Sequence, residues 1–208
     1  MNSSLPDKVD VLAEALADLS RGDDQSASER ISAGYAFEAR VTAKRTWTPA
    51  RALSIFRRDG FVDRYSGKRL VYPGALRVLS KLLPEAFPAH PDWKMSETHF
   101  AYWELFPTLD HIVPIARGGV DSEGNLVTTS FLRNQAKSSW ALDDLGWTLH
   151  PPGNIDEWDG LMSATSSLIE ARPSLLEGDN YLRGWHFAAS SIGLPNKAMQ
   201  AVRPPAGR

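Results

Sequence analysis

Four polar residues in the second half of the chain are of the types that can hydrolyse a phosphodiester with the help of a metal ion. Asp110 and His111 are adjacent, and Asn125 and Asn134 follow at intervals of 14 and 9 residues. A histidine can take a proton from water near neutral pH. Carboxylate and amide oxygens are ligands that hard divalent cations prefer, and such a cation stabilises developing negative charge. The combination predicts metal-assisted hydrolysis with His111 as general base.

The segments around these residues predict short elements that would bring them together. An apolar run over 108–114 surrounds the Asp-His pair, and Arg117-Gly118-Gly119 predicts a turn. A second short strand is predicted over 126–129, followed by a helix over 131–142 that carries Asn134. Neighbouring residues of a strand point to opposite faces, so the Asp and His side chains would serve different partners.

Four segments, in this order, resemble the motif of the HNH endonucleases: Leu109-Asp110-His111-Ile112-Val113-Pro114, Arg117-Gly118-Gly119, Asn125-Leu126-Val127 and Arg133-Asn134-Gln135-Ala136-Lys137. The resemblance covers about residues 61–146 and is strongest over 108–137. It implies an α+β fold with a ββα-metal core flanked by N- and C-terminal helices. It also implies a divalent-metal-dependent nuclease that cleaves DNA.

The resemblance implies a role for each residue of the motif. Asp110 and Asn134 would hold one cation, His111 would activate water, and Asn125 would hold the general base in place. Because Asn rather than His stands on the helix, the ligand set is all oxygen and favours Mg²⁺ or Mn²⁺. Lys137, one helical turn after Asn134, and Arg117 in the glycine turn are candidates for phosphate contacts. The alternative for each is an ordinary solvated side chain, which we favour for Arg117, whereas the two alternatives are balanced for Lys137.

The chain departs from many HNH proteins because it has no cysteine. Those relatives carry two Cys-x-x-Cys pairs that bind a structural zinc. The equivalent places here read Asp63-Arg64-Tyr65-Ser66 and Ser130-Phe131-Leu132-Arg133. We expect these two segments to lie close together, with a salt bridge or a close hydrogen-bonded contact between Asp63 and Arg133 in place of the metal. The alternative is that both residues are exposed and unpaired, in which case the pair would contribute little.

Patterning divides the chain into three predicted regions. Residues 1–45 form an N-terminal helical region, and residues 46–150 form the nuclease core with an insertion at about 71–106. Residues 151–208 form a C-terminal helical region with a flexible tail. The insertion either provides scaffold, which we favour, or contacts DNA. Helical or hairpin spacing and turn residues predict the elements outside the motif: helices over 9–19 (capped by Asp7), 48–60, 75–83, 155–171 and 181–192, and a hairpin over 61–71.

Charge is distributed unevenly although the net charge is only −2. Residues 1–30 hold seven acids and three bases, whereas residues 37–70 hold nine bases and three acids. The basic segment either follows a phosphate backbone or forms a solvated helix face.

No apolar run reaches membrane-spanning length, and charges interrupt the region where a signal peptide would be apolar. We therefore expect a cytoplasmic protein that binds no membrane, of open oligomeric state. The net charge itself argues mildly against a nucleic-acid binder, so DNA as the partner is what the resemblance implies.

Two other functions compete with the nuclease. One is a catalytically inactive nucleic-acid-binding module that keeps the HNH fold, which would bind DNA without metal and without cleavage. The other is a structural or interaction protein in which Asp110 and His111 form an incidental ion pair. The complete set of four residues in order counts against both.

Overall fold

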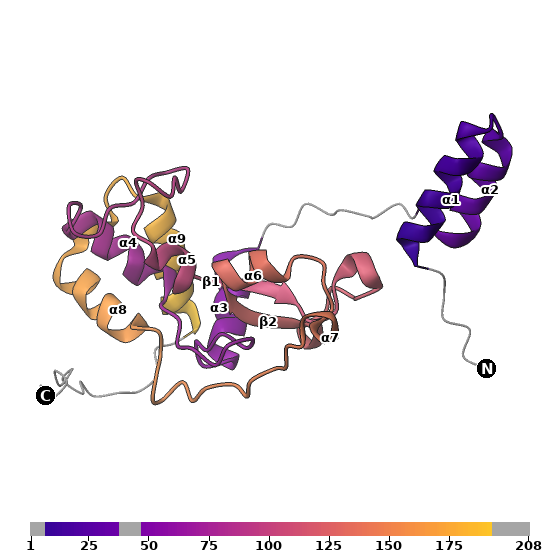
Figure 1. The fold of residues 1–208 in the computed structure, drawn as a ribbon. Coiled ribbons are helices and arrows are strands. Elements are labelled where there is room, and N and C mark those ends of the chain that lie inside the picture. The colour runs from indigo at the N-terminus through magenta and orange to yellow at the C-terminus, as the bar shows by residue number, and fades with distance from the viewer. Residues whose placement is uncertain (1–6, 38–46, 193–208) are drawn as a thin grey trace, which may run out of the picture. The chain divides into compact units, whose positions relative to one another are not determined.

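A computed structural model describes residues 7–37 and 47–192 (Figure 1). The chain divides into two units, Met1–Thr42 and Ala43–Arg208. The first boundary thus lies close to the predicted one, whereas the predicted core and C-terminal regions belong to one unit. The predicted flexible tail lies outside the described residues. Within the described ranges, no helix has the length and apolar character needed to cross a membrane.

The first unit is a hairpin of two helices, α1 (Lys8–Ser20) and α2 (Asp24–Gly34). The carboxylate of Asp7 accepts a hydrogen bond from the Val9 N–H, which confirms the predicted N-cap. The side chains of α1 that are buried against α2 include Val11 and Ala15. They are not Val9, Leu12, Leu16 and Leu19, the apolar residues whose spacing predicted the helix.

The second unit mixes helix and strand, which confirms the α+β class at that level. Its helices and strands are α3 (Pro49–Arg58), α4 (Pro73–Leu82), α5 (Ala101–Glu104), β1 (Pro107–His111), β2 (Leu126–Ser130), α6 (Phe131–Lys137), α7 (Leu142–Leu145), α8 (Met162–Ala171) and α9 (Asn180–Ile192). Thr48 caps α3 as predicted. Three predictions were too long. The hairpin over 61–71 is reduced to one bridge between Val62 and Arg69, and α8 begins only after Gly160 and Leu161, which both have positive φ. The helix predicted over 131–142 ends as α6 at Lys137, where Ser138 has a φ of 48°.

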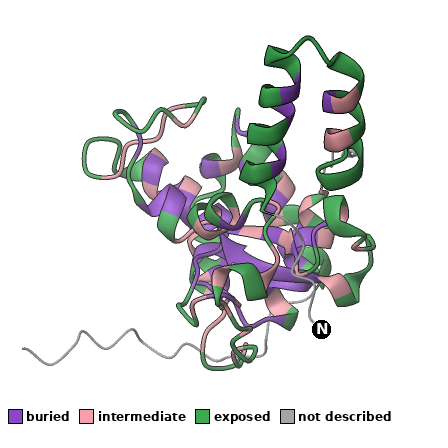
Figure 2. Cartoon of the chain, turned by 45° about the vertical axis from the view of Figure 1, so that its right-hand side comes forward, coloured by how far each residue is buried: buried purple, intermediate pink, exposed green. Residues whose placement is uncertain are grey.

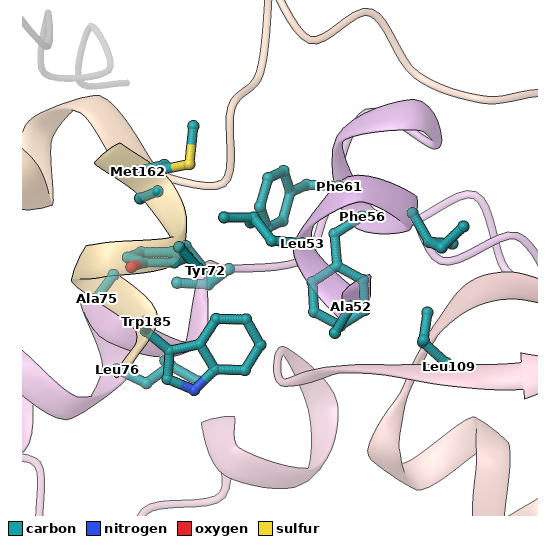
Figure 3. Close-up of a cluster of buried hydrophobic side chains, with 14 of the residues drawn as sticks. Ala52, Leu53, Phe56, Phe61, Tyr72, Ala75, Leu76, Leu109, Met162 and Trp185 are labelled. Carbon is teal, nitrogen blue, oxygen red and sulfur yellow. The ribbon is translucent and has the colours of Figure 1, made fainter. Parts of the chain in front are cut away.

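The main hydrophobic core joins elements from distant parts of the chain. Phe56 of α3 stacks on Trp185 of α9 at 6.2 Å between ring centroids, and Tyr72 meets the same Trp185 edge-on (Figure 3). Tyr102 and Trp103 of α5 are buried in the same cluster. The insertion at 71–106 therefore provides scaffold, because its aromatic residues complete the core on which β1 and β2 rest.

The sheet has only two strands, so each strand has one edge without a neighbouring strand. β1 and β2 pair antiparallel, with Leu109 opposite Thr128. At the outer edge of β2, the Thr128 N–H donates to Asp59 (2.8 Å) and the Ser130 N–H donates to Asp63 (3.1 Å). Both carboxylates are almost fully buried. They satisfy backbone groups that a third strand would otherwise pair with.

The outer edge of β1 is covered by α6. The side-chain amide of Asn134 donates to the Leu109 carbonyl at 3.2 Å, and the Lys137 ammonium donates to the His111 carbonyl at 2.8 Å. Residues 134 and 137 lie one turn apart, which matches the spacing of alternate carbonyls along the strand. Helix α6 is therefore attached to β1 by the side chains of two residues from the predicted site.

The contact predicted in place of a zinc ion is partly right. The two segments do lie together, because Asp63 accepts hydrogen bonds from Thr129 Oγ1 and the Ser130 N–H. The predicted ion pair with Arg133 is wrong, since the Arg133 guanidinium lies over the Trp147 ring, 5.2 Å from its centroid. Backbone and hydroxyl donors at the start of α6 reach the buried carboxylate instead.

Removing the carboxylate of Asp59 should destabilise the second unit. Asp59 accepts bonds from Arg58, Arg64 and the Thr128 N–H. Asp59→Ala leaves a buried N–H unpaired and separates two arginines from their counter-charge, so we expect a loss of roughly 2–4 kcal/mol in the free energy of unfolding. Thermal or denaturant unfolding would measure it. Asp92→Ala, at an exposed carboxylate, is the control, and equal stability of the two variants would contradict the role of Asp59.

Candidate functional site

Asp110 and His111 lie at the end of β1 and point to opposite faces of the strand, as the sequence predicts. The burial of β1 alternates, and His111 belongs to the buried set with 5% of its surface exposed. The Asp110 side chain is 12% exposed and lies on the side that meets Lys137. The two residues therefore have separate sets of partners.

Asp110 is held by two donors. Its Oδ2 atom accepts a hydrogen bond from the Tyr65 hydroxyl at 2.7 Å and lies 2.8 Å from the Lys137 ammonium. Burial, together with the negative charge of Asp110, raises the pKa of Tyr65. The tyrosine therefore remains a protonated donor, and it fixes the orientation of the carboxylate.

Lys137 has no exposed surface, which corrects the expectation that it contacts a phosphate. Its ammonium is bonded to Asp110 and to the His111 carbonyl inside the site. A buried ammonium is retained only where such partners offset its loss of hydration. Arg117 forms an ion pair with Asp144 at 2.5 Å and lies over Trp140, so its contact with phosphate stays a prediction.

The Asn134 side chain is oriented by two bonds from its amide nitrogen, to Thr108 Oγ1 at 3.0 Å and to the Leu109 carbonyl. Because the nitrogen makes both bonds, the amide oxygen points to the other side. Asp110 and Asn134 thus offer one carboxylate and one amide oxygen, which fit a hard cation such as Mg²⁺. Among residues 7–37 and 47–192, no three His, Asp or Glu side chains converge. A cation at this place would therefore depend on water and phosphate for its other ligands.

Asn125 has the architectural position that the resemblance implies. Its Oδ1 accepts from the Val113 N–H, and its Nδ2 donates to the carbonyls of Val113 and Val120, each at 2.9 Å. Gly119 permits this closure, since a Cβ there would lie 1.9 Å from the Val113 carbonyl oxygen. Asn125 thus fixes the loop that follows His111.

His111 has a partner that the sequence did not reveal. Its Nε2 lies 3.1 Å from Asp121 Oδ1, and its ring lies 6.1 Å from that of Trp47. Arg51 lies 3.7 Å from the same carboxylate. Asp121 is an acidic residue two positions after Gly119, and only this placement in the turn could have drawn attention to it.

An apolar hollow of about 420 Å³ opens beside the edge of β1. Thr108, Leu109 and Asn134 form part of its wall, so it is continuous with the candidate site. The remaining wall is rich in aromatic rings, which include Trp47, Phe106, Phe131 and Trp185. The candidate site therefore has a polar side, at Asp110 and Asn134, and an apolar side.

Compared with protein-family models, with curated proteins and with solved structures, the chain has no match. The case for its function therefore depends on the residues and geometry described above.

Replacing Asn125 by Ala should loosen the loop after His111. The change removes three hydrogen bonds and leaves the Val113 N–H without its acceptor, at a cost of roughly 1–3 kcal/mol in stability. We expect a lower melting temperature and faster hydrogen exchange of the Val113 amide. Glu123→Ala, an exposed change in the same loop, is the control. Unchanged exchange at Val113 would show that Asn125 does not hold this loop.

Proposed function

We propose that the chain is a metal-dependent endonuclease of the HNH type that hydrolyses DNA phosphodiester bonds. The observation that supports this best is the arrangement at the end of β1. Asp110 of β1 is paired with Lys137 of α6, and Asn134 of α6 bonds to Thr108 of β1. The residue after Asp110, His111, is paired with the carboxylate of Asp121. Oxygen donors and a general base on neighbouring residues are what metal-assisted hydrolysis requires.

His111 acts as the general base in this proposal. A carboxylate can only accept a hydrogen bond, so Asp121 requires the proton of the neutral ring on Nε2. Asp121 holds the ring in this tautomer and stabilises the imidazolium that forms, and Asn125 keeps the adjoining loop in place.

Asp110 and Asn134 hold the divalent cation, Mg²⁺ or Mn²⁺, in this proposal. When bound, the cation supplies positive charge that stabilises the phosphate and the leaving oxygen in the transition state. Tyr65 fixes the Asp110 carboxylate, and the bonds from Asn134 to β1 fix the direction of its amide oxygen. These contacts preorganise the two oxygen donors before the substrate arrives.

The second candidate is a catalytically inactive nucleic-acid-binding module, and one observation favours it. Lys137 already provides a positive charge 2.8 Å from Asp110, where a divalent cation would compete with it. The basic segment gives this candidate less support than its charge suggests. Arg58 and Arg64 are both bonded to the buried Asp59. Binding of DNA without metal and without cleavage would select this candidate.

A plasmid-nicking assay with the full chain tests the proposal. We expect nicking with Mg²⁺ or Mn²⁺ and none with EDTA. His111→Ala should lower the rate by a factor of about 10²–10⁴, the usual contribution of a general base. His150→Ala, at an exposed histidine, is the matched control, and circular dichroism checks that both variants fold.

Cleavage by folded His111→Ala at the wild-type rate would contradict the mechanism. Cleavage that persists in EDTA would contradict the metal. If DNA is bound but stays intact under all metal conditions, the nucleic-acid-binding module is favoured over the nuclease.

A further inference from the structure

Helix α1 has two apolar faces, and only one of them is covered within the hairpin. Val11 and Ala15 are buried, as is Ala27 of α2. The other face carries four larger residues that are exposed: Val9 (68%), Leu12 (42%), Leu16 (66%) and Leu19 (45%). Figure 2 shows buried positions along one side of α1 and exposed surface over the rest of the helix. We name these four residues the α1 seam.

The spacing of the α1 seam is that of a coiled-coil interface. The intervals between its residues are three, four and three, which correspond to positions a, d, a and d of the heptad repeat. Val9 and Leu16 occupy position a, and Leu12 and Leu19 occupy position d. Valine at a with leucine at d favours pairing of two helices, and one of the two a positions here is a valine. The seam therefore has the pattern of a surface that pairs with another helix of the same kind.

The hairpin has too small an interior to be stable through its own contacts. Its helices have 13 and 11 residues, a length at which isolated helices are marginal in water. Besides Val11, Ala15 and Ala27, the interface between the helices holds Asp18, which is paired with Arg30. A unit of this size needs additional apolar burial, and the exposed α1 seam is where it is available.

The charges on α1 are compatible with a second copy of the same helix. Positions e and g, which flank a coiled-coil seam, hold Lys8, Ala13, Ala15 and Ser20 and therefore no acid. Asp10 and Glu14 lie at positions b and f, away from the seam, so two copies avoid repulsion between carboxylates. With seven acids and three bases over residues 7–37, this unit is not a surface for DNA.

We propose that two copies of the chain pair through their α1 seams. The pairing buries the four apolar residues of each copy and turns two hairpins into one four-helix unit with a larger core. It also gives each particle two copies of the candidate site on Ala43–Arg208. The pairing does not depend on the proposed nuclease function.

Sedimentation equilibrium or light scattering of the full chain, over a range of concentrations, tests the pairing. We expect a mass of twice 23.0 kDa for the wild-type protein. Leu16→Glu places a carboxylate in the seam and should weaken association by about tenfold or more. Ala17→Glu adds the same charge at the next residue, which is exposed and lies outside the seam, so its dissociation constant should stay at the wild-type value.

A wild-type chain that stays monomeric at all concentrations would overturn the proposal, whether the seam is covered by the second unit of its own chain or by another protein. Equal masses for the Leu16→Glu and Ala17→Glu variants would overturn it too. Helix content from circular dichroism shows whether both variants keep the hairpin. The masses are measured without DNA or metal, so this result is independent of whether the protein cleaves DNA.

Discussion

The structure depends on side chains that form hydrogen bonds with the backbone groups at both edges of a two-stranded sheet. A hairpin of two strands is marginal by itself, because half of its backbone groups lack a partner strand. Here Asp59 and Asp63 bind the N–H groups of β2, while Asn134 and Lys137 bind the carbonyls of β1. These buried carboxylates tie the segment over 59–63 to β2.

The same contacts connect stability with chemistry. Asn134 and Lys137 attach α6 to β1, and they are also the residues next to Asp110 and His111. Lys137 is fully buried, so its charge is tolerable only because Asp110 forms an ion pair with it and the His111 carbonyl accepts a hydrogen bond from it. The ammonium balances the carboxylate of Asp110.

The sequence predicted those features of the structure that depend on the local pattern of residues. The strands around Asp110 and Leu126 follow from short apolar runs bounded by turns, and the position of Asn125 follows from its place between the glycine turn and the second strand. It did not predict contacts between segments far apart in the chain. The burial of Lys137 and the bond from Thr128 to Asp59 depend on how helices pack across 26 and 69 residues. Asp121 is close in sequence, but only the path of the loop brings it to His111.

The prediction for α1 shows the same limit. Apolar spacing gave the helix, yet the residues that face α2 are small ones between the residues of the apolar stripe. A helical period shows that a face is apolar, but not which element covers it.

Manganese-induced line broadening in NMR spectra of the full chain tests the central claim most directly, because Mn²⁺ broadens signals from nearby nuclei. If Asp110 and Asn134 hold the cation, the Asn134 side-chain amide and the amides at the end of β1 should broaden first. Asp110→Asn should remove that broadening. Broadening confined to the acidic α1–α2 unit, or broadening around Asn134 that is unchanged in Asp110→Asn, would contradict a metal site between β1 and α6.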